Sequence, residues 1–228
     1  AGRAWDQIRT SICYMNLDVR IAGAHGGVSV GPDGATHQAL EDVALMRVLP
    51  NMKVLVPADS NQTRAAVLAS LEADGPVYIR FGRNPVPQLY TSDEKVKIGR
   101  GNLLREGNDV TLVACGAMVS LSIEAASILQ GRGISAGIID MVSVKPLDRK
   151  LLVGQAEKTG AVVVAEDHQV AGGLFGTVAE TLAREMPVKM DVAAVQDSFG
   201  TSGTPAEVRE IFGLAASAIA EKAVRIMH

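Results

Sequence analysis

Two patterns of hydrophobic residues alternate along the first part of the chain. Short apolar runs at 19–24, 53–56 and 77–81 are rich in β-branched residues, which is typical of strands. Between them, segments 38–49 and 60–73 place apolar residues three and four positions apart, as on one face of a helix. This alternation predicts βαβ units and therefore a parallel sheet.

The same alternation returns after residue 101. The strands expected there lie at 110–115, 136–139, 161–165 and 188–195. The expected helices follow the first of these strands, begin at Asp148, run from about 173 to 185, and begin at Thr204. The start at Thr204 is well marked, because Pro205 suits the first helical position and Glu207 completes a capping box.

The chain between Asn84 and Gly101 interrupts both patterns. Its sequence, NPVPQLYTSDEKVKIGRG, combines prolines, polar residues and mixed charges, which is typical of a connector. We therefore predict two three-layer α/β domains with mainly parallel sheets, at 1–90 and 102–228, joined by a linker at 91–101.

The first predicted domain is small for a parallel sheet, because it has only about three strands. The chain opens with AGRAWDQIRTSICY, in which Ala4, Ile8 and Ile12 lie on one side of an amphipathic helix. No capping residue leads into this helix. We therefore expect that the beginning of the domain is missing from the sequence.

Composition and charge exclude several classes of function. The 228 residues are 47% hydrophobic, enough for a sizeable core, and the net charge of −3 offers no basic excess for nucleic acid or an anionic membrane. No apolar run approaches the roughly 20 residues that span a bilayer, and no signal-peptide pattern opens the chain, so we expect a cytoplasmic protein. Cys13 and Cys115 match no zinc or redox spacing and are interpreted as structural.

Segment 25–37, HGGVSVGPDGATH, is the first candidate site. It follows the strand expected at 19–24, and ligands of open α/β sheets bind at the carboxyl ends of strands. Such connections usually have about 2–6 residues, and this one is longer. Its glycines permit close approach of the backbone to a ligand, while His25, Asp33 and His37 offer two proton carriers and an anion.

Other interpretations of this segment are open or weaker. It matches neither the dinucleotide pattern G-x-G-x-x-G nor a Walker loop. A metal site of His25, Asp33 and His37 is conceivable, but their spacing matches no metal motif, and we assign no metal ligands. From composition alone, a glycine-rich surface turn that caps the next helix is an equal alternative.

Two further segments contain candidate chemistry. Arg83 ends the run YIRFGR at the same expected sheet edge, where its guanidinium suits a phosphate or carboxylate. An exposed arginine before a linker is an equal alternative. Glu166, Asp167 and His168 follow an apolar strand and precede a glycine pair, so capping of the next helix or contact with another subunit is favoured over catalysis.

Several stretches resemble one known family. AGRAWDQIR, HGGVSVGPDGATHQALEDVALMRVLPNMKVLVPAD and GPVYIRFGR resemble the pyrimidine-binding domain of transketolases. VTLVACGAMV, VSVKPLD and VVVAEDHQVAGGLFG resemble the transketolase C-terminal domain. The resemblance covers nearly the whole chain and is strongest to the C-terminal subunit of split transketolases, which are divided between two polypeptides. The G-x-DG-x-THQ segment is shared by transketolases and deoxyxylulose phosphate synthases.

The resemblance implies roles for four residues. His25 and Arg83 match residues that contact the sugar phosphate along the substrate channel, and Asp33 matches an aspartate that contacts a substrate hydroxyl. His37 matches a histidine near the cofactor's aminopyrimidine and the reacting carbonyl. We therefore expect His25, Asp33 and Arg83 to bind substrate, and His37 to act in both catalysis and cofactor binding. A guanidinium and a protonated imidazole suit a dianion, and an imidazole N–H suits charge that develops on oxygen.

The resemblance also implies a reaction and its partners. The reaction is transfer of a two-carbon ketol unit between sugar phosphates, as in the pentose phosphate pathway, with thiamine diphosphate and Mg²⁺. The family's activating glutamate, its aromatic pocket and its GDG…N metal signature are not present in this sequence. We therefore expect an N-terminal partner subunit that anchors most of the cofactor, self-association, and little activity of the chain alone. Ala24 and Pro32, where the family usually has Thr and often Glu, leave the sugar open.

Two alternatives to this function remain. A deoxyxylulose phosphate synthase would use the same fold, but YIRFGRNPVP favours a transketolase, because the synthase is expected to end that strand with Pro-Arg-Gly. A non-catalytic assembly or regulatory module would explain the missing glutamate. The presence of His25, Asp33, His37 and Arg83 together argues against such a module.

Overall fold

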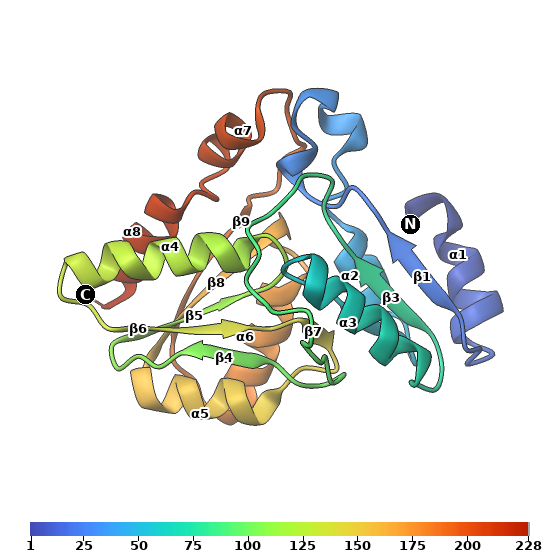
Figure 1. Ribbon diagram of the computed structural model, residues 1–228, viewed down its shortest axis with the longest axis horizontal. Coiled ribbons are helices and arrows are strands. Elements are labelled where there is room, and N and C mark those ends of the chain that lie inside the picture. The colour runs from blue at the N-terminus through green and yellow to red at the C-terminus, as the bar shows by residue number, and fades with distance from the viewer. Residues whose placement is uncertain (228) are drawn as a thin grey trace.

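The computed structural model describes residues 1–227, which two β-sheets organise (Figure 1). The first sheet has the order β1-β3-β2-β7. Its strands are β1 (Arg20–Gly23), β2 (Lys53–Leu55), β3 (Val77–Arg80) and β7 (Ser143–Lys145). β1, β2 and β3 are parallel, as predicted, and Tyr78 of β3 pairs with both Ile21 and Val54. β7 was not predicted, because this short antiparallel strand comes from the second half of the chain.

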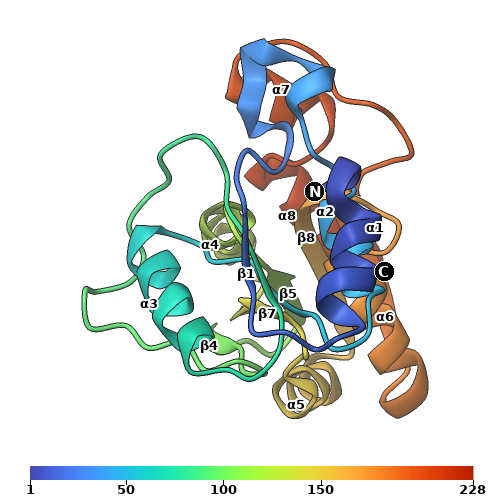
Figure 2. The ribbon, with the colours of Figure 1, turned by 90° about the vertical axis from the view of Figure 1, so that its right-hand side faces the viewer.

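Helices cover both faces of the first sheet (Figure 2). α3 (Ser60–Leu71) lies on one face, and α2 (Asp42–Arg47) lies on the other with the N-terminal helical segment. That segment consists of a 3₁₀ turn, α1 and a π-helical turn, at Gly2–Ala4, Trp5–Gln7 and Ile8–Cys13. It is amphipathic as predicted, since Ile8 and Cys13 are buried and most of its other residues are exposed.

The helix predicted at 38–49 is shorter in the structure and begins at Asp42. The backbone before it bonds to other parts of the molecule. The N–H of Gly27 donates to the carbonyl oxygen of Ala39 at 2.8 Å, and the carbonyl oxygen of Leu40 accepts a hydrogen bond from the second half of the chain. These tertiary contacts use the groups that an earlier helical turn would need, so the prediction was wrong at this end.

The second sheet has the order β4-β6-β5-β8-β9. Its strands are β4 (Asn102–Arg105), β5 (Val110–Ala114), β6 (Ala136–Asp140), β8 (Ala161–Gln169) and β9 (Lys189–Val195). The four predicted strands are parallel, and the unpredicted β4 is an antiparallel edge. The two sheets therefore confirm the predicted α/β fold class with mainly parallel sheets.

Helices also cover both faces of the second sheet (Figure 1). α4 (Met118–Gly131) and α8 (Ala216–Met227) lie on one face, and α5 (Arg149–Thr159) and α6 (Leu174–Glu185) lie on the other. α7 (Pro205–Ile211) begins at the predicted capping box, in which Thr204 and Glu207 bond reciprocally. α7 packs against residues 28–33 of the first half of the chain, so it contributes to the candidate site described below.

One hydrophobic core joins the two halves of the chain. It includes Met46, Val54 and Tyr78 from the first half and Val113 and Met141 from the second. All five side chains are at most 2% exposed. The two sheets are therefore held together by apolar packing as well as by β7.

The segment predicted as a linker contains no helix or strand between residues 84 and 101. It is nevertheless anchored, because Asp59 Oδ2 accepts hydrogen bonds from the N–H groups of Leu89 and Tyr90 at 2.7 and 2.8 Å. The hydroxyl of Tyr90 donates to the buried carboxyl of Asp140 at 2.6 Å. Burial raises the pKa of Asp140 to about 6. The predicted boundaries at 1–90, 91–101 and 102–228 stay predictions.

Candidate functional site

The glycine-rich segment leaves the carboxyl end of β1, next to the carboxyl end of β3. It contains short 3₁₀ turns at Val28–Asp33, which a kink at Gly31 interrupts, and at Ala35–His37. Gly27, Gly31 and Gly34 have φ values of +91°, +67° and +73°, which residues with a β-carbon rarely adopt. Residues 28–31 are buried, so the segment is a packed loop and not a loose surface turn. We call residues 25–38 the glycine-rich loop.

Two of the four expected site residues bond to each other. Arg83 Nη1 lies 2.6 Å from Asp33 Oδ2, and their side chains are 43% and 40% exposed. The pair therefore brings the end of the YIRFGR run onto the glycine-rich loop. Exposed ion pairs contribute only about 0–1 kcal/mol, so both groups can exchange partners with a ligand at low cost.

The two histidines of the loop are exposed. His37 Nδ1 lies 3.0 Å from the hydroxyl of Thr36, and His25 has a φ of +63° in the left-handed region. Among residues 1–227, no hydrogen bond joins either imidazole to Asp33 or Arg83. The structure thus brings Asp33 and Arg83 into contact and leaves both histidines open to solvent at the same loop.

Residues 166–168 have a different role from the loop, and they lie within β8, which extends beyond the predicted end at residue 165. Glu166 accepts hydrogen bonds from the N–H groups of Leu174 and Phe175 at 2.7 and 2.9 Å, which confirms that it caps the next helix. Burial raises the pKa of Glu166 to about 7 against the effect of these hydrogen bonds.

His168 is buried and satisfied by backbone groups. Its Nδ1 lies 2.7 Å from the carbonyl oxygen of Gln169, and its Nε2 accepts a hydrogen bond from the N–H of Ala44 at 3.3 Å. This arrangement corresponds to a neutral imidazole with its proton on Nδ1. Burial lowers the pKa of His168, and the nearby charge of Arg80 lowers it further. His168 therefore has a structural environment.

Sequence reasoning missed Arg80, which is buried at the end of β3. Its Nη2 donates to the backbone oxygen of Asp167 at 2.7 Å, and its Nε lies 3.4 Å from Asp42 Oδ2. Asp42 in turn accepts a hydrogen bond from the hydroxyl of Tyr78 at 2.7 Å. The signal in the sequence was an arginine within the otherwise apolar run 77–81, because a buried charge needs a partner.

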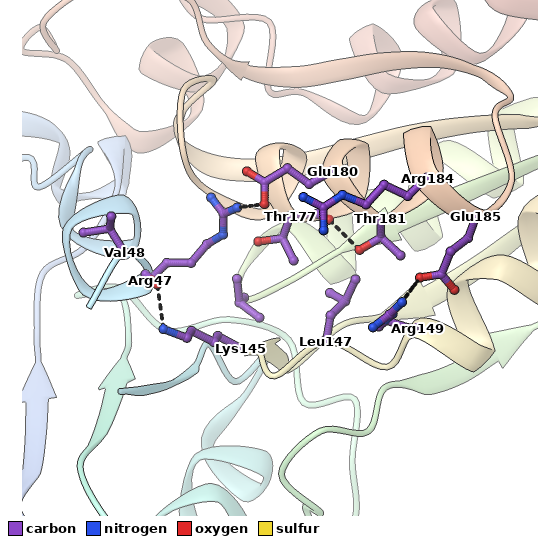
Figure 3. A pocket seen from close by; sticks show the side chains of 11 residues that line it. Arg47, Val48, Lys145, Leu147, Arg149, Thr177, Glu180, Thr181, Arg184 and Glu185 are labelled. Atoms are coloured by element: carbon purple, nitrogen blue, oxygen red, sulfur yellow. Dashed lines mark hydrogen bonds and ion pairs between the residues drawn. The ribbon is translucent and has the colours of Figure 1, made fainter. Parts of the chain in front are cut away.

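Two pockets are lined by residues from both halves of the chain, but neither is lined by any of the four expected site residues. Figure 3 shows one of about 500 Å³, where Arg47 of α2 pairs with Glu180 of α6 and Arg149 pairs with Glu185. The other, of about 400 Å³, touches the candidate site at Ser29.

Two further features are absent from residues 1–227. No helix there is long and apolar enough to cross a membrane. No group of three or more His, Cys, Asp or Glu side chains within this range is placed to hold a metal ion.

Comparisons with known families define the class of this fold. The transketolase pyrimidine binding domain matches residues 1–88, and the transketolase C-terminal domain matches residues 99–219. These two domains lie in the same order as the two sheets. The chain therefore belongs to the transketolase family.

The similar proteins include subunits of divided transketolases. The 6-deoxy-6-sulfo-D-fructose transketolase subunit SqwH of Clostridium sp. (strain MSTE9) is 41% identical over 97% of this chain and 69% of its own length. A subunit of the apulose-4-phosphate transketolase of Phocaeicola vulgatus is 35% identical over 99% of this chain and 72% of its own length. The 1-deoxy-D-xylulose-5-phosphate synthase of Heliobacterium modesticaldum is 38% identical over 97% of this chain but only 34% of its own length.

A solved structure agrees with the fold. A split gene transketolase, described as an inactive beta4 tetramer, has a TM-score of 0.93 and 50% identity, covering 99% of this chain and 72% of that chain. The predicted resemblance to the C-terminal subunits of split transketolases is thereby confirmed.

Proposed function

We propose that this chain is the C-terminal subunit of a thiamine-diphosphate-dependent transketolase, which transfers a two-carbon ketol unit between sugar phosphates. The observation that carries the proposal is the pairing of Arg83 with Asp33 on a loop that also exposes His25 and His37. The loop lies at the carboxyl ends of β1 and β3, and open α/β sheets bind their ligands at this edge.

The cofactor fits this chain only in part. When bound, thiamine diphosphate supplies the carbon chemistry of ketol transfer. The exposed imidazole of His37 suits the side of the site that faces the cofactor ring and the substrate carbonyl. Residues 1–227 offer no cluster of metal-ligating side chains, so the Mg²⁺ and the diphosphate would be held by an N-terminal partner subunit.

Arg83 and His25 would bind the anionic end of the sugar. A guanidinium donates two parallel hydrogen bonds to an oxyanion, and a protonated imidazole adds a third. The names of two relatives contain a sulfonated and a phosphorylated sugar, which supports recognition of a terminal oxyanion. Binding of this group would release Asp33 from Arg83.

Asp33 and His37 would act nearer the reacting carbonyl. The released carboxylate of Asp33 can accept a hydrogen bond from a sugar hydroxyl, which would select stereochemistry. His37 can donate a hydrogen bond to oxygen charge that develops at the carbonyl. In this proposal His37 is the catalytic residue of the chain, and it contacts both cofactor and substrate.

The assembly would contain both subunits. The tetramer of the related split transketolase is described as inactive, which supports the proposal that copies of this chain associate but need the partner for activity. Participation in the pentose phosphate pathway and a cytoplasmic location stay predictions.

A synthase of the deoxyxylulose phosphate type is the second candidate. It is supported by the 38% identity to the Heliobacterium modesticaldum enzyme. The two functions differ in their donor, because the synthase would decarboxylate pyruvate whereas a transketolase would cleave a ketose phosphate. An assay with both donors therefore separates them, and absence of either reaction with any partner would favour a non-catalytic module.

The proposal is tested by mixing the full-length version of this subunit with N-terminal transketolase subunits, thiamine diphosphate and Mg²⁺. We expect ketol transfer from fructose 6-phosphate, and we expect Arg83→Ala to lower kcat/KM for this donor about tenfold or more, since it removes charge-assisted hydrogen bonds. Transfer from unphosphorylated fructose should fall much less. The matched control is Arg64→Ala, at an exposed position on α3. Equal losses for both donors would contradict the oxyanion role of Arg83.

A further inference from the structure

Two buried side chains hold the peptide groups of Val28 from opposite sides. The N–H of Val28 donates to Asp167 Oδ1 at 2.8 Å, and its carbonyl oxygen accepts a hydrogen bond from Gln38 Nε2 at 3.2 Å. Gln38 Nε2 also donates to the carbonyl oxygen of Thr201 at 2.9 Å. Val28 is fully buried, and Asp167 and Gln38 are 5% and 6% exposed. The glycine-rich loop is therefore anchored at this residue by contacts to both halves of the chain.

The backbone beside Val28 packs directly on charged side chains. A β-carbon at Gly27 would overlap the carboxyl group of Asp167, and one at Gly26 would overlap the guanidinium of Arg80. Only glycines allow this close approach. The two glycines after His25 thus serve contact with the protein's own buried charges.

Arg80 supports the charge of Asp167. Its Nη2 donates to the backbone oxygen of Asp167 at 2.7 Å and to that of Ala39 at 3.3 Å. Burial raises the pKa of Asp167, while the charge of Arg80 and the N–H of Val28 oppose this shift. The carboxylate therefore lies in an environment built from a guanidinium and backbone donors.

We propose that Asp167 is a positioning residue for the glycine-rich loop: through Val28 it sets the placement of His25 and Asp33 toward the sugar. Asp167 lies on β8, in the second half of the chain, whereas the loop lies in the first. A strand of the second sheet would thus determine the geometry of the glycine-rich loop, which follows a strand of the first sheet. That the ligand is a sugar phosphate rests on the proposed function. That Asp167 anchors the loop does not depend on that function.

The anchoring is tested by hydrogen exchange on the isolated full chain. Asp167→Asn keeps the size of the side chain but removes the charge that the loop N–H bonds to. We expect amides in residues 27–30 to exchange about tenfold faster, because a neutral amide oxygen is a weaker acceptor for the Val28 N–H than the carboxylate. The matched control is Glu166→Gln on the neighbouring buried acid. Its effect should lie at Leu174 and Phe175 and leave the loop unchanged.

Kinetics of the assembled enzyme separate positioning from stability. We expect Asp167→Asn to raise KM for fructose 6-phosphate about tenfold while kcat changes less, because misplaced binding residues weaken substrate binding. Loss of folded protein would instead lower the apparent kcat without changing KM. A fall in kcat alone would overturn the proposal, as would unchanged exchange of residues 27–30.

A second variant covers the case in which Asp167→Asn does not fold. Gln38→Leu removes the hydrogen bond to the Val28 carbonyl and keeps a side chain of similar size. It should speed exchange of the same loop amides without affecting Leu174, and no change would overturn the anchoring. If the wild-type assembly shows no ketol transfer, the proposed function fails, and the exchange measurements still decide the role of Asp167.

Discussion

Residues 25–37 and residues 166–168 both contain carboxyl and imidazole groups, but the first segment follows β1, the second lies in the last part of β8, and the two differ in burial. Asp33 of the loop pairs with Arg83, and their side chains are 40% and 43% exposed. In β8, the side chains of Glu166 and His168 are 2% and 1% exposed. Exposed groups can exchange their partners for a ligand, whereas buried groups must be satisfied within the protein. Burial, and not residue type, therefore separates the proposed substrate-binding residues of the loop from the residues that support it.

The largest expected difference in stability is between the arginine that contacts each region, Arg83 at the loop and Arg80 at Asp167. Arg80→Met would leave the carboxylates of Asp42 and Asp167 buried without their guanidinium, so we expect the free energy of unfolding to fall by about 3–5 kcal/mol. The matched control Arg83→Met removes only an exposed pair and should cost less than about 1 kcal/mol. Urea unfolding of both variants measures the difference. Similar losses would show that burial does not separate the two sites.

A smaller loss of stability is expected when a side chain is added where Gly27 packs against Asp167. Gly27→Ala adds a β-carbon against Asp167 at a φ of +91°, and we expect a loss of about 3 kcal/mol from strain and overpacking. The control is Gly133→Ala, where φ is +77° but no atom lies within 4 Å of the new β-carbon. It should cost about 1 kcal/mol, from the backbone conformation alone. Equal costs in thermal or urea unfolding would argue against tight packing of the loop on Asp167.

The smallest expected effect is a pH dependence in the buried segment. The pKa of Glu166 is raised from its ordinary 4.5 to about 7, so the folded protein binds this proton more tightly than the unfolded chain. The resulting stability is complete below about pH 4.5 and is lost as the pH rises through 7. Glu166→Gln lacks this decline. From pH 5 to 7.5, the unfolding free energy of the wild type minus that of the variant should therefore fall by about 2 kcal/mol. A constant difference would contradict the raised pKa.

The sequence predicted the parallel strands well, because β5 and residues 161–165 of β8 are mostly apolar runs, although β8 continues to Gln169 in the structure. It failed for β4 and β7, which are short antiparallel strands without a pattern of their own. Their pairing depends on neighbours that lie far away along the chain. It failed also at the start of α2, where long-range hydrogen bonds replace a helical turn.

For the candidate site, the sequence indicated which loop and which four residues to consider. It did not indicate Arg80, Asp167 or Gln38 as the residues that hold the loop. Nothing local distinguishes Asp167, which bonds to the N–H of Val28, from Glu166, which caps α6. Only the approach of β8 to the loop assigns them different partners.

The amino-acid sequence by itself determined the α/β class, the order of the parallel strands along the chain and the chemistry available at the glycine-rich loop. These features follow from local periodicity, caps and residue type. The tertiary structure alone decided which charged groups are buried, that Arg83 meets Asp33, and that the second sheet holds a loop of the first. The physical reason is that desolvation and pairing depend on residues far apart in sequence, which local patterns do not record.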